Sequence, residues 1–309
     1  MAGLTLAFAP ARRTRSRGRG FLRRLAGDPA GRIVCALLIL LFAAGFGASW
    51  IVPYNTSAED LVAALHTPSL SAANGHVHPL GTDKLGRDVL SRVLVGLRVS
   101  LSVAFAVVPL STALGAGMGL LSGYAGGRTD LALMRVVDAQ VAIPALLLMI
   151  AVIAALGPGL AQIVAVLAVA GWPVYARVIR SEVLALRRRE FVAAATAVGV
   201  PSARIMVRHV APNVVPTTIV LATLQLPIVI VSEAALSFLG LGIQPPTPSL
   251  GQMLAEAQDV IWQAWWLPVI PGAMISIVVL VFNLLGDRVR DILDPRLRGI
   301  AYTQPHLGR

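Results

Sequence analysis

Six segments of this chain are long and apolar enough to cross a lipid bilayer as helices, and they restrict the fold more than any other feature. A membrane-spanning helix needs about 20 predominantly apolar residues. The segments lie at about 33–52, 99–122, 138–156, 160–176, 214–239 and 267–286. The third and fourth belong to one long uncharged run, which Leu156-Gly157-Pro158-Gly159 divides with a turn. The sequence therefore predicts an all-α membrane protein with six transmembrane helices, the third and fourth forming a hairpin.

The composition agrees with a membrane protein and argues against a nucleic-acid-binding one. Hydrophobic residues make up 56% of the chain and charged residues 13%, whereas soluble domains carry about 25% charged residues. The net charge of +11 would suit nucleic acid, but the basic residues fall in groups between the apolar segments, as determinants of membrane topology do. Cys35 is the only cysteine, so a disulfide within the chain is excluded.

The distribution of arginine predicts that both termini are cytoplasmic. Eight arginines lie in residues 12–32 and seven in 177–213, whereas none lies between the fifth and sixth apolar segments. Cytoplasmic loops are enriched in lysine and arginine. The first apolar segment is too long for a signal peptide and is predicted to stay as an anchor. The resulting layout is a basic cytoplasmic tail at 1–32, a transmembrane helix at 33–52, an extracytoplasmic segment at 53–98 and a cytoplasmic tail at 287–309.

The loop at 177–213 is too polar for lipid and has a helical pattern. Residues 181–198 contain good helix formers, and Gly199 follows where a left-handed C-terminal cap is expected. Pro201 suits the first turn of a second helix, which we expect to run to His209 and to end before Pro212. The small side chains of Ala193, Ala194 and Ala197 would let a partner approach closely. The alternative is a helix that lies on lipid headgroups.

A second motif, at 78–92, precedes the second apolar segment and reads HPLGTDKLGRDVLSR. Gly81 and Gly86 are expected in turns, and Asp83 and Asp88 can cap helices or pair with arginines of the motif. The interpretation that we favour is an ordered extracytoplasmic collar rather than a substrate contact. The residues assigned to this collar motif are Gly81, Thr82, Asp83, Gly86, Arg87 and Asp88.

Glu233 lies near the end of the fifth apolar segment. Carboxylates in such segments are costly and often functional. We predict a role in helix packing or gating rather than in proton relay, because no second carboxylate or histidine lies at a comparable depth.

The sequence lacks the motifs of several enzyme classes. A P-loop needs lysine followed by serine or threonine, but the only lysine, Lys84, is followed by Leu85. His76 and His78 have no thiol or third histidine nearby to complete a metal site. We therefore expect no catalytic residue, cofactor or metal in this chain, and any use of ATP and Mg²⁺ would belong to another subunit.

Several of these motifs resemble one family. Ala193-Ala194-Ala195, Gly199 and Pro212 resemble the EAA loop of ATP-binding cassette (ABC) importer permeases, with Ala193 where that loop has glutamate and Ala211 where it has leucine. The collar motif is similar to the same region of C-type permeases of dipeptide and oligopeptide importers. Further likeness is found at 138–144, 232–246 and 286–298.

The resemblance implies a type I permease fold over 97–286 and a multi-protein importer in the cytoplasmic (inner) membrane of a prokaryote. Its implied partners are a second, B-type permease, two P-loop ATPase subunits or one fused ATPase, an extracytoplasmic substrate-binding protein and membrane lipid. Dipeptides, oligopeptides, nickel complexes and haem are all possible substrates on this basis. The residues assigned to ATPase coupling are Glu190, Ala193, Ala194, Ala195, Ala197, Gly199, Pro201, His209 and Pro212.

The alternative function is a secondary transporter or channel that is driven by an ion gradient and needs no ATPase. Such proteins place ionisable groups at mid-membrane. The first, second, fourth and sixth apolar segments have no charged residue in their middles, which disfavours this alternative.

Overall fold

The computed structural model describes residues 25, 27, 29–70, 72–73 and 76–293. The predicted N-terminal tail at 1–32 lies almost wholly outside the described residues, as does the C-terminal tail beyond residue 293. Nearly all regular structure in the described part is helical, apart from β1 (Ala72–Ala73) and β2 (His76–Val77), which pair antiparallel.

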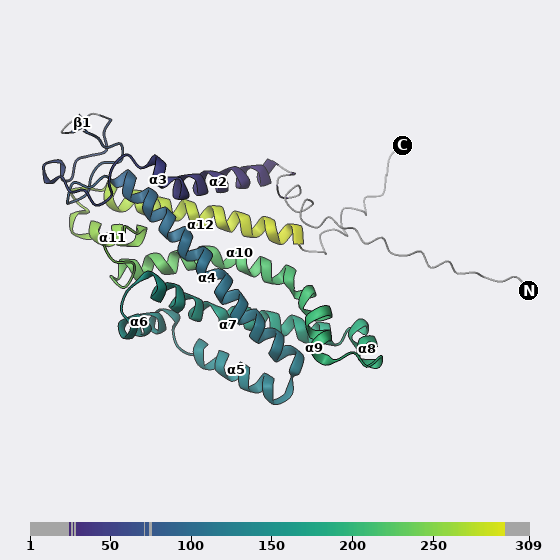
Figure 1. Cartoon of the computed structure of the whole chain (residues 1–309). Coiled ribbons are helices and arrows are strands. Elements are labelled where there is room, and N and C mark those ends of the chain that lie inside the picture. The colour runs from purple at the N-terminus through teal and green to yellow at the C-terminus, as the bar shows by residue number, and fades with distance from the viewer. Residues whose placement is uncertain (1–24, 26, 28, 71, 74–75, 294–309) are drawn as a thin grey trace, which may run out of the picture.

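The long helices lie side by side in an elongated bundle (Figure 1). They and the shorter helices are α2 (Pro29–Phe46), α3 (Ala48–Ile51), α4 (Val89–Ala125), α5 (Gly127–Val141), α6 (Ala145–Leu156), α7 (Leu160–Arg187), α8 (Glu190–Ala197), α9 (Ser202–Ile205), α10 (Ala211–Phe238), α11 (Leu250–Ala257) and α12 (Trp266–Leu293). Two 3₁₀ turns, Leu61–Ala63 and Gln258–Val260, and a π-helical segment, Met206–Val210, complete the helical elements of the described chain.

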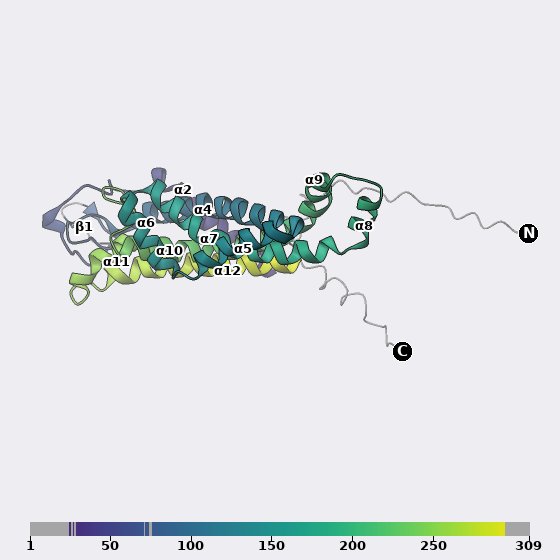
Figure 2. The same cartoon turned by 90° about the horizontal axis from the view of Figure 1, so that it is seen from below.

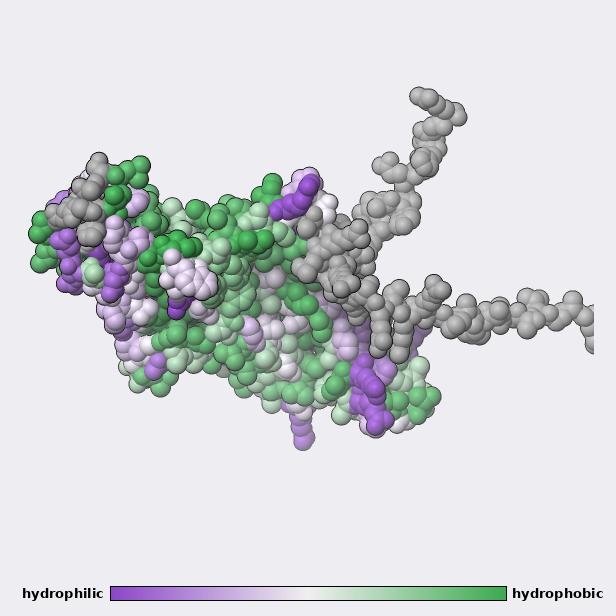
Figure 3. Space-filling view, turned by 45° about the horizontal axis from the view of Figure 1, so that its top comes forward, coloured by the Kyte–Doolittle hydropathy of each residue, from purple (hydrophilic) through white to green (hydrophobic). Residues whose placement is uncertain are grey.

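Figures 1 and 2 place α8 and α9 at one end of the bundle and β1 and α11 at the other. These are called the α8 end and the α11 end below. Figure 3 shows hydrophobic residues over the middle of the visible face and hydrophilic residues gathered toward the ends. This distribution is the one that a bundle crossing a bilayer requires.

Five helices in the described chain are long and apolar enough to cross a membrane, and the number is six if a bent pair is counted as one span. The pair is α5 and α6, which meet at 87°. The expectation of one helix over 138–156 is therefore wrong. Pro144 explains the break, because proline has no N–H to donate and disfavours helical geometry in the residue before it. The predicted turn at Gly157 is confirmed, since α6 ends at Leu156 and α7 begins at Leu160.

The helices α4 and α7 pack against each other more extensively than any other pair in the described chain. Gly115, Gly119 and Gly123 lie on the face of α4 that contacts α7. A Cβ atom added to Gly119 would lie 2.6 Å from the carbonyl oxygen of Ala176 on α7. Small residues at this spacing let two backbones approach closely, which is a common way to hold membrane helices together.

Glu233 joins α10 to α4. Its side chain is fully buried, and its two carboxylate oxygens accept hydrogen bonds of 2.8 Å each from the hydroxyls of Ser100 and Ser237. Because Ser100 belongs to α4, the carboxylate ties two helices together. This geometry supports the predicted packing role.

Replacing Glu233 with alanine should lower the free energy of unfolding by about 1–3 kcal/mol, because both serine hydroxyls lose their acceptor in a buried site. Glu233→Gln keeps the size of the side chain and one acceptor oxygen, so its loss should be smaller. Denaturant unfolding in mixed micelles would compare the two variants. An alanine variant as stable as the unsubstituted protein would contradict a packing role.

Candidate functional site

The loop at 177–213 forms the α8 end. The helix predicted over 181–198 is not continuous: α7 ends at Arg187, the chain turns at Arg188 and Arg189, and α8 begins at Glu190. Arg189 has an extended backbone, with φ −77° and ψ 148°. Figure 2 shows α8 projecting from the bundle. The break therefore turns α8 away from the line of α7.

The predicted left-handed conformation at Gly199 is confirmed, with φ +79°. The backbone N–H of Val200 donates to the carbonyl oxygen of Ala195 at 3.1 Å, and that of Gly199 donates to Thr196 at 3.0 Å. This pattern closes the C-terminus of α8. A Cβ atom at Gly199 would meet no atom within 4 Å, so only the backbone conformation favours glycine there.

The second helix of the loop differs from the prediction. Pro201 immediately precedes α9, as expected of a helix start, but the helix does not end before Pro212. It continues through the π-helical segment Met206–Val210 into α10. The backbone N–H of Ala211 donates to the carbonyl of Met206, five residues back. Because of this wider turn, Pro212 lies in the first turn of α10. Proline is tolerated there, since the first turn of a helix does not need its N–H as a donor.

One side of α8 is buried and the other is exposed. Val192 packs in an apolar group with Ile179, Ile205, Val210 and Val214, which come from α7, α9, the π-helical segment and α10. Of the predicted contact residues in α8, Glu190, Ala193, Ala194 and Ala197 are exposed and Ala195 is half-buried. The predicted contact residues that follow α8 are exposed as well; they are Gly199, Pro201, His209 and Pro212. Val192 thus connects α8 by apolar contacts to the two long helices α7 and α10.

The structure adds residues that the sequence interpretation missed at this end. Phe191 and Val198 are large apolar side chains with exposed fractions of 42% and 78%. A hollow of about 830 Å³ lies beside α8 and is lined in part by Tyr124, Arg187 and Ala193. The Arg187 guanidinium carbon lies 6.0 Å from the centroid of the Tyr124 ring. Single apolar residues in a basic loop do not mark an exposed surface, so Phe191 and Val198 could not be found from the sequence.

At the α11 end, the collar motif is ordered, and its two glycines have the positive φ typical of turns. Gly81 and Gly86 have φ +76° and +73°. The Asp88 carboxylate caps α4 by accepting from the backbone N–H of Ser91 at 2.8 Å, and its other oxygen lies 2.9 Å from Nδ1 of His78. Thr82 is fully buried, and its hydroxyl donates to the carbonyl of Ala63 at 2.5 Å.

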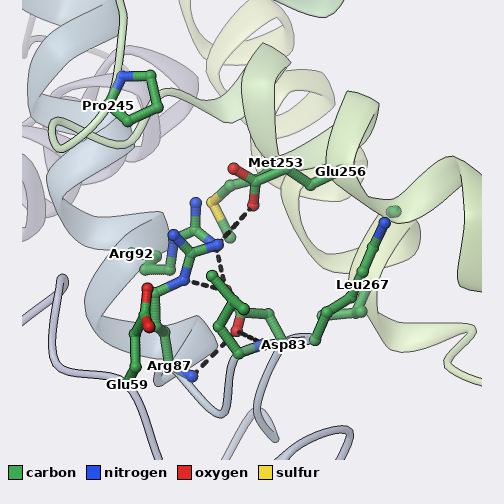
Figure 4. Close-up of a pocket in the computed structure, with 11 residues that line it drawn as sticks. Glu59, Asp83, Arg87, Arg92, Pro245, Met253, Glu256 and Leu267 are labelled. Carbon is green, nitrogen blue, oxygen red and sulfur yellow. Dashed lines mark hydrogen bonds and ion pairs between the residues drawn. The ribbon is translucent and has the colours of Figure 1, made fainter. Parts of the chain in front are cut away.

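Asp83 is the centre of an ion-pair network in which Asp83 and Arg92 are buried and the other members are partly buried. One carboxylate oxygen accepts from the backbone N–H groups of Leu85 and Arg87, and the other accepts from Nε of Arg87 at 2.7 Å and from Nη1 of Arg92. Both arginines also donate to Glu256 on α11, at 2.9 and 2.8 Å. We call Asp83, Arg87, Arg92 and Glu256 the Asp83 network (Figure 4). The prediction that Asp83 pairs with arginines of the motif is confirmed.

The two predicted sites are not brought together. Figure 1 shows the loop around α8 and the segment before α4 at opposite ends of the molecule, while α4, α7 and α10 connect them. The arrangement is a long helical membrane bundle with an ordered charged collar at one end and a protruding helix, coupled to the bundle by buried contacts, at the other. This arrangement suits a transport protein that spans a membrane.

Comparisons with known proteins show the family to which this chain belongs. The chain belongs to the family described as binding-protein-dependent transport system inner membrane component, which matches residues 115–299. It has the type I ABC importer permease fold.

Two relatives match most of the chain. It is 42% identical over 265 residues to the di/tripeptide transport system permease protein DppC of Pseudomonas aeruginosa, covering 86% of this chain and 87% of that protein. It is 35% identical to the probable D,D-dipeptide transport system permease protein DdpC of Escherichia coli, covering 96% of this chain and 97% of that protein.

A solved structure of the MetNI methionine ABC transporter in an inward-facing conformation is similar in fold. The TM-score is 0.55 at 19% identity, and the match covers 66% of this chain and 96% of that one. At this identity the likeness concerns the fold alone. It agrees with the bundle described above.

Proposed function

We propose that this chain is one of two permease subunits of an ABC importer that carries peptides into the cell. The α8 end faces the cytoplasm together with both termini, and the α11 end faces outside. A second permease completes the path, ATPase subunits bind at α8, and a substrate-binding protein delivers cargo to the α11 end. The peptide substrate rests on relatives whose names describe di- and tripeptide or dipeptide transport.

The observation that carries the proposal is the geometry of α8. It presents small, exposed residues to a partner while Val192, on its other side, packs against residues of α7 and α10. A partner that moves α8 would therefore move two long helices. Binding of ATP to the partner shifts the equilibrium between two conformations of the permease only if the partner's affinity for α8 differs between these conformations.

The chemistry of ATP hydrolysis belongs to the partners in this proposal, with Mg²⁺ held there as well. The permease contributes no catalytic residue. Glu190 precedes Ala193 by three residues, and both are exposed on α8. Residues three apart lie on nearly the same helical face, so Glu190 supplies the carboxylate that the position of Ala193 lacks.

Purification from the native membrane through a C-terminal tag tests the proposal. We expect a second permease and P-loop ATPase subunits to accompany the chain, with ATP hydrolysis that depends on the loop at 177–213. A chain that purifies alone and moves solute in vesicles without ATP would reject the proposal and favour gradient-driven transport.

We predict that Gly199→Val uncouples transport from ATP hydrolysis. Valine disfavours the left-handed backbone of Gly199 by about 1–2 kcal/mol, which would reorient α8 while leaving membrane insertion intact. Uptake per ATP hydrolysed should fall several-fold in proteoliposomes.

Gly199→Asn is the matched control for this variant, because asparagine adopts the left-handed region far more readily than valine. It should keep most of the coupling. Normal ATP-driven uptake by the valine variant would show that the conformation of Gly199 is not needed for coupling.

A further inference from the structure

A cavity of about 440 Å³ lies at the α11 end, between the segment before α4 and the helices α11 and α12. Figure 4 shows the Asp83 network on its wall. The charged residues that line it are Glu59, Asp83, Glu256, Lys84, Arg87 and Arg92. Because three of them are acidic and three are basic, the cavity suits a dipolar ligand of no net charge better than a simple anion or cation.

Arg92 lines this cavity, and its guanidinium group does not use all of its hydrogen-bond donors. Its side chain is only 3% exposed. Nη1 donates to both Asp83 and Glu256, whereas Nε is buried and has no partner within the described residues. A buried guanidinium group whose donors are only partly paired is unfavourable, and a ligand carboxylate in the cavity would add a charge-assisted hydrogen bond to this group.

Glu59 offers the opposite charge. It is exposed, and no hydrogen bond or ion pair joins it to another described residue. Lys84 is not comparably available, since its Nζ donates to Asp259 at 2.7 Å. The available groups are therefore one buried cationic donor and one free carboxylate.

The rest of the lining is apolar, with Pro245, Met253, Ala257 and Leu267 on the walls. An uncharged side chain of a ligand would lie against these residues. The volume is within the range of about 300–1,000 Å³ that small-molecule sites occupy. It is ample for a peptide of two residues.

We propose that this cavity binds a short peptide by its two charged ends, with the carboxylate at the guanidinium of Arg92 and the ammonium group at Glu59. The site would receive the peptide at the α11 end before it passes between the permeases. This inference rests on the proposed peptide transport, which it deepens by assigning a first contact within this chain.

Equilibrium dialysis of the full-length chain in lipid nanodiscs tests the inference directly, with radiolabelled dialanine as the probe. We expect dialanine to bind, and a dialanine blocked at both ends to compete at least 10-fold more weakly. Glu59→Gln should weaken binding of dialanine at least 5-fold. It should not weaken binding of N-acetyl-dialanine, which has a carboxylate but no ammonium group.

Asp287→Asn, which removes an exposed carboxylate from the opposite end of α12, is the matched control and should leave dialanine binding unchanged. Absence of dialanine binding, or equal loss of both peptides in Glu59→Gln, would overturn the inference. If Glu59→Gln instead weakened only the capture of a substrate-binding protein, the cavity would be a protein contact and the assigned ligand would be wrong.

These results are separate from those that test the importer itself. Co-purification of ATPase subunits does not depend on Glu59, so the importer proposal can hold while this site fails. Conversely, the isolated chain can bind dialanine even if no ATPase accompanies it.

Discussion

Gly115→Ala should destabilise the protein by about 3 kcal/mol, at the upper end of the usual range for overpacking a close interface. The added Cβ atom would lie 2.2 Å from the carbonyl oxygen of Trp172 and 2.6 Å from the Cβ of Tyr175. Both belong to α7, and the nearer contact is with backbone, which has no rotamer to change. The helices α4 and α7 would have to separate, and their interface is the largest in the described bundle.

Gly117→Ala is the control for this prediction. Gly117 lies in the same helix, two residues away, and its added Cβ atom would meet nothing within 4 Å. Since alanine has a better helix propensity than glycine, this variant should be as stable as the original or slightly more stable. Denaturant unfolding in mixed micelles would compare the two, and equal stability would show that α4 and α7 do not need this close approach.

These glycines also show what a sequence can reveal and what it cannot. The apolar length of 99–122 was enough to predict a membrane helix, because a bilayer imposes a minimum length on any helix that crosses it. It did not reveal which glycines face α7. Gly115 and Gly117 have the same side chain, and only the position of the neighbouring helix distinguishes them.

Local chemistry allowed the turns to be predicted. A left-handed conformation was expected at Gly199 and a turn at Gly86, and both residues have a positive φ. One wrong prediction was the helix over 181–198, which breaks at Arg188 and Arg189 without a proline. The other two concerned helix continuity around proline. At Pro144 two helices meet at 87°, whereas at Pro212 a π-helical segment lets the helix continue. Proline thus interrupts the helix at one position and is accommodated within a continuous helix at the other. The outcome depends on the hydrogen bonds of the preceding turn.

The partner of the collar motif could not be predicted. Asp83, Arg87 and Arg92 are close in sequence, and their pairing follows from that proximity. Glu256 is 164 positions beyond Arg92, on a short helix with no motif to mark it. The path of the chain through α10 and α11 brings it to the arginines, so tertiary structure alone reveals the network as a four-residue unit.

Asp83→Asn should cost about 3–5 kcal/mol of stability, which is the usual loss when one partner of a buried ion pair is removed. The amide keeps one oxygen, which can still accept from the backbone N–H groups of Leu85 and Arg87. Its NH₂ group, however, would face the guanidinium groups of Arg87 and Arg92. Because an NH₂ group cannot accept their hydrogen bonds, both arginines would lose this acceptor. Glu256 would be left as the only acid of the Asp83 network opposite two arginines.

Asp259→Asn is the control, because it removes a carboxylate of the same chemistry from an exposed ion pair. Asp259 pairs with Lys84 at 2.7 Å, and its side chain is 82% exposed. Exposed pairs contribute about 0–1 kcal/mol, so this loss should be small. Unfolding of both variants in mixed micelles at low and high salt gives the comparison. The Asp83→Asn defect should persist at high salt, since the pair of Asp83 and Arg92 is buried and buried pairs are poorly screened. Defects of equal size would mean that the Asp83 network is no more than a set of surface charges, and that the collar is held by its turns and its apolar contacts with α11 and α12.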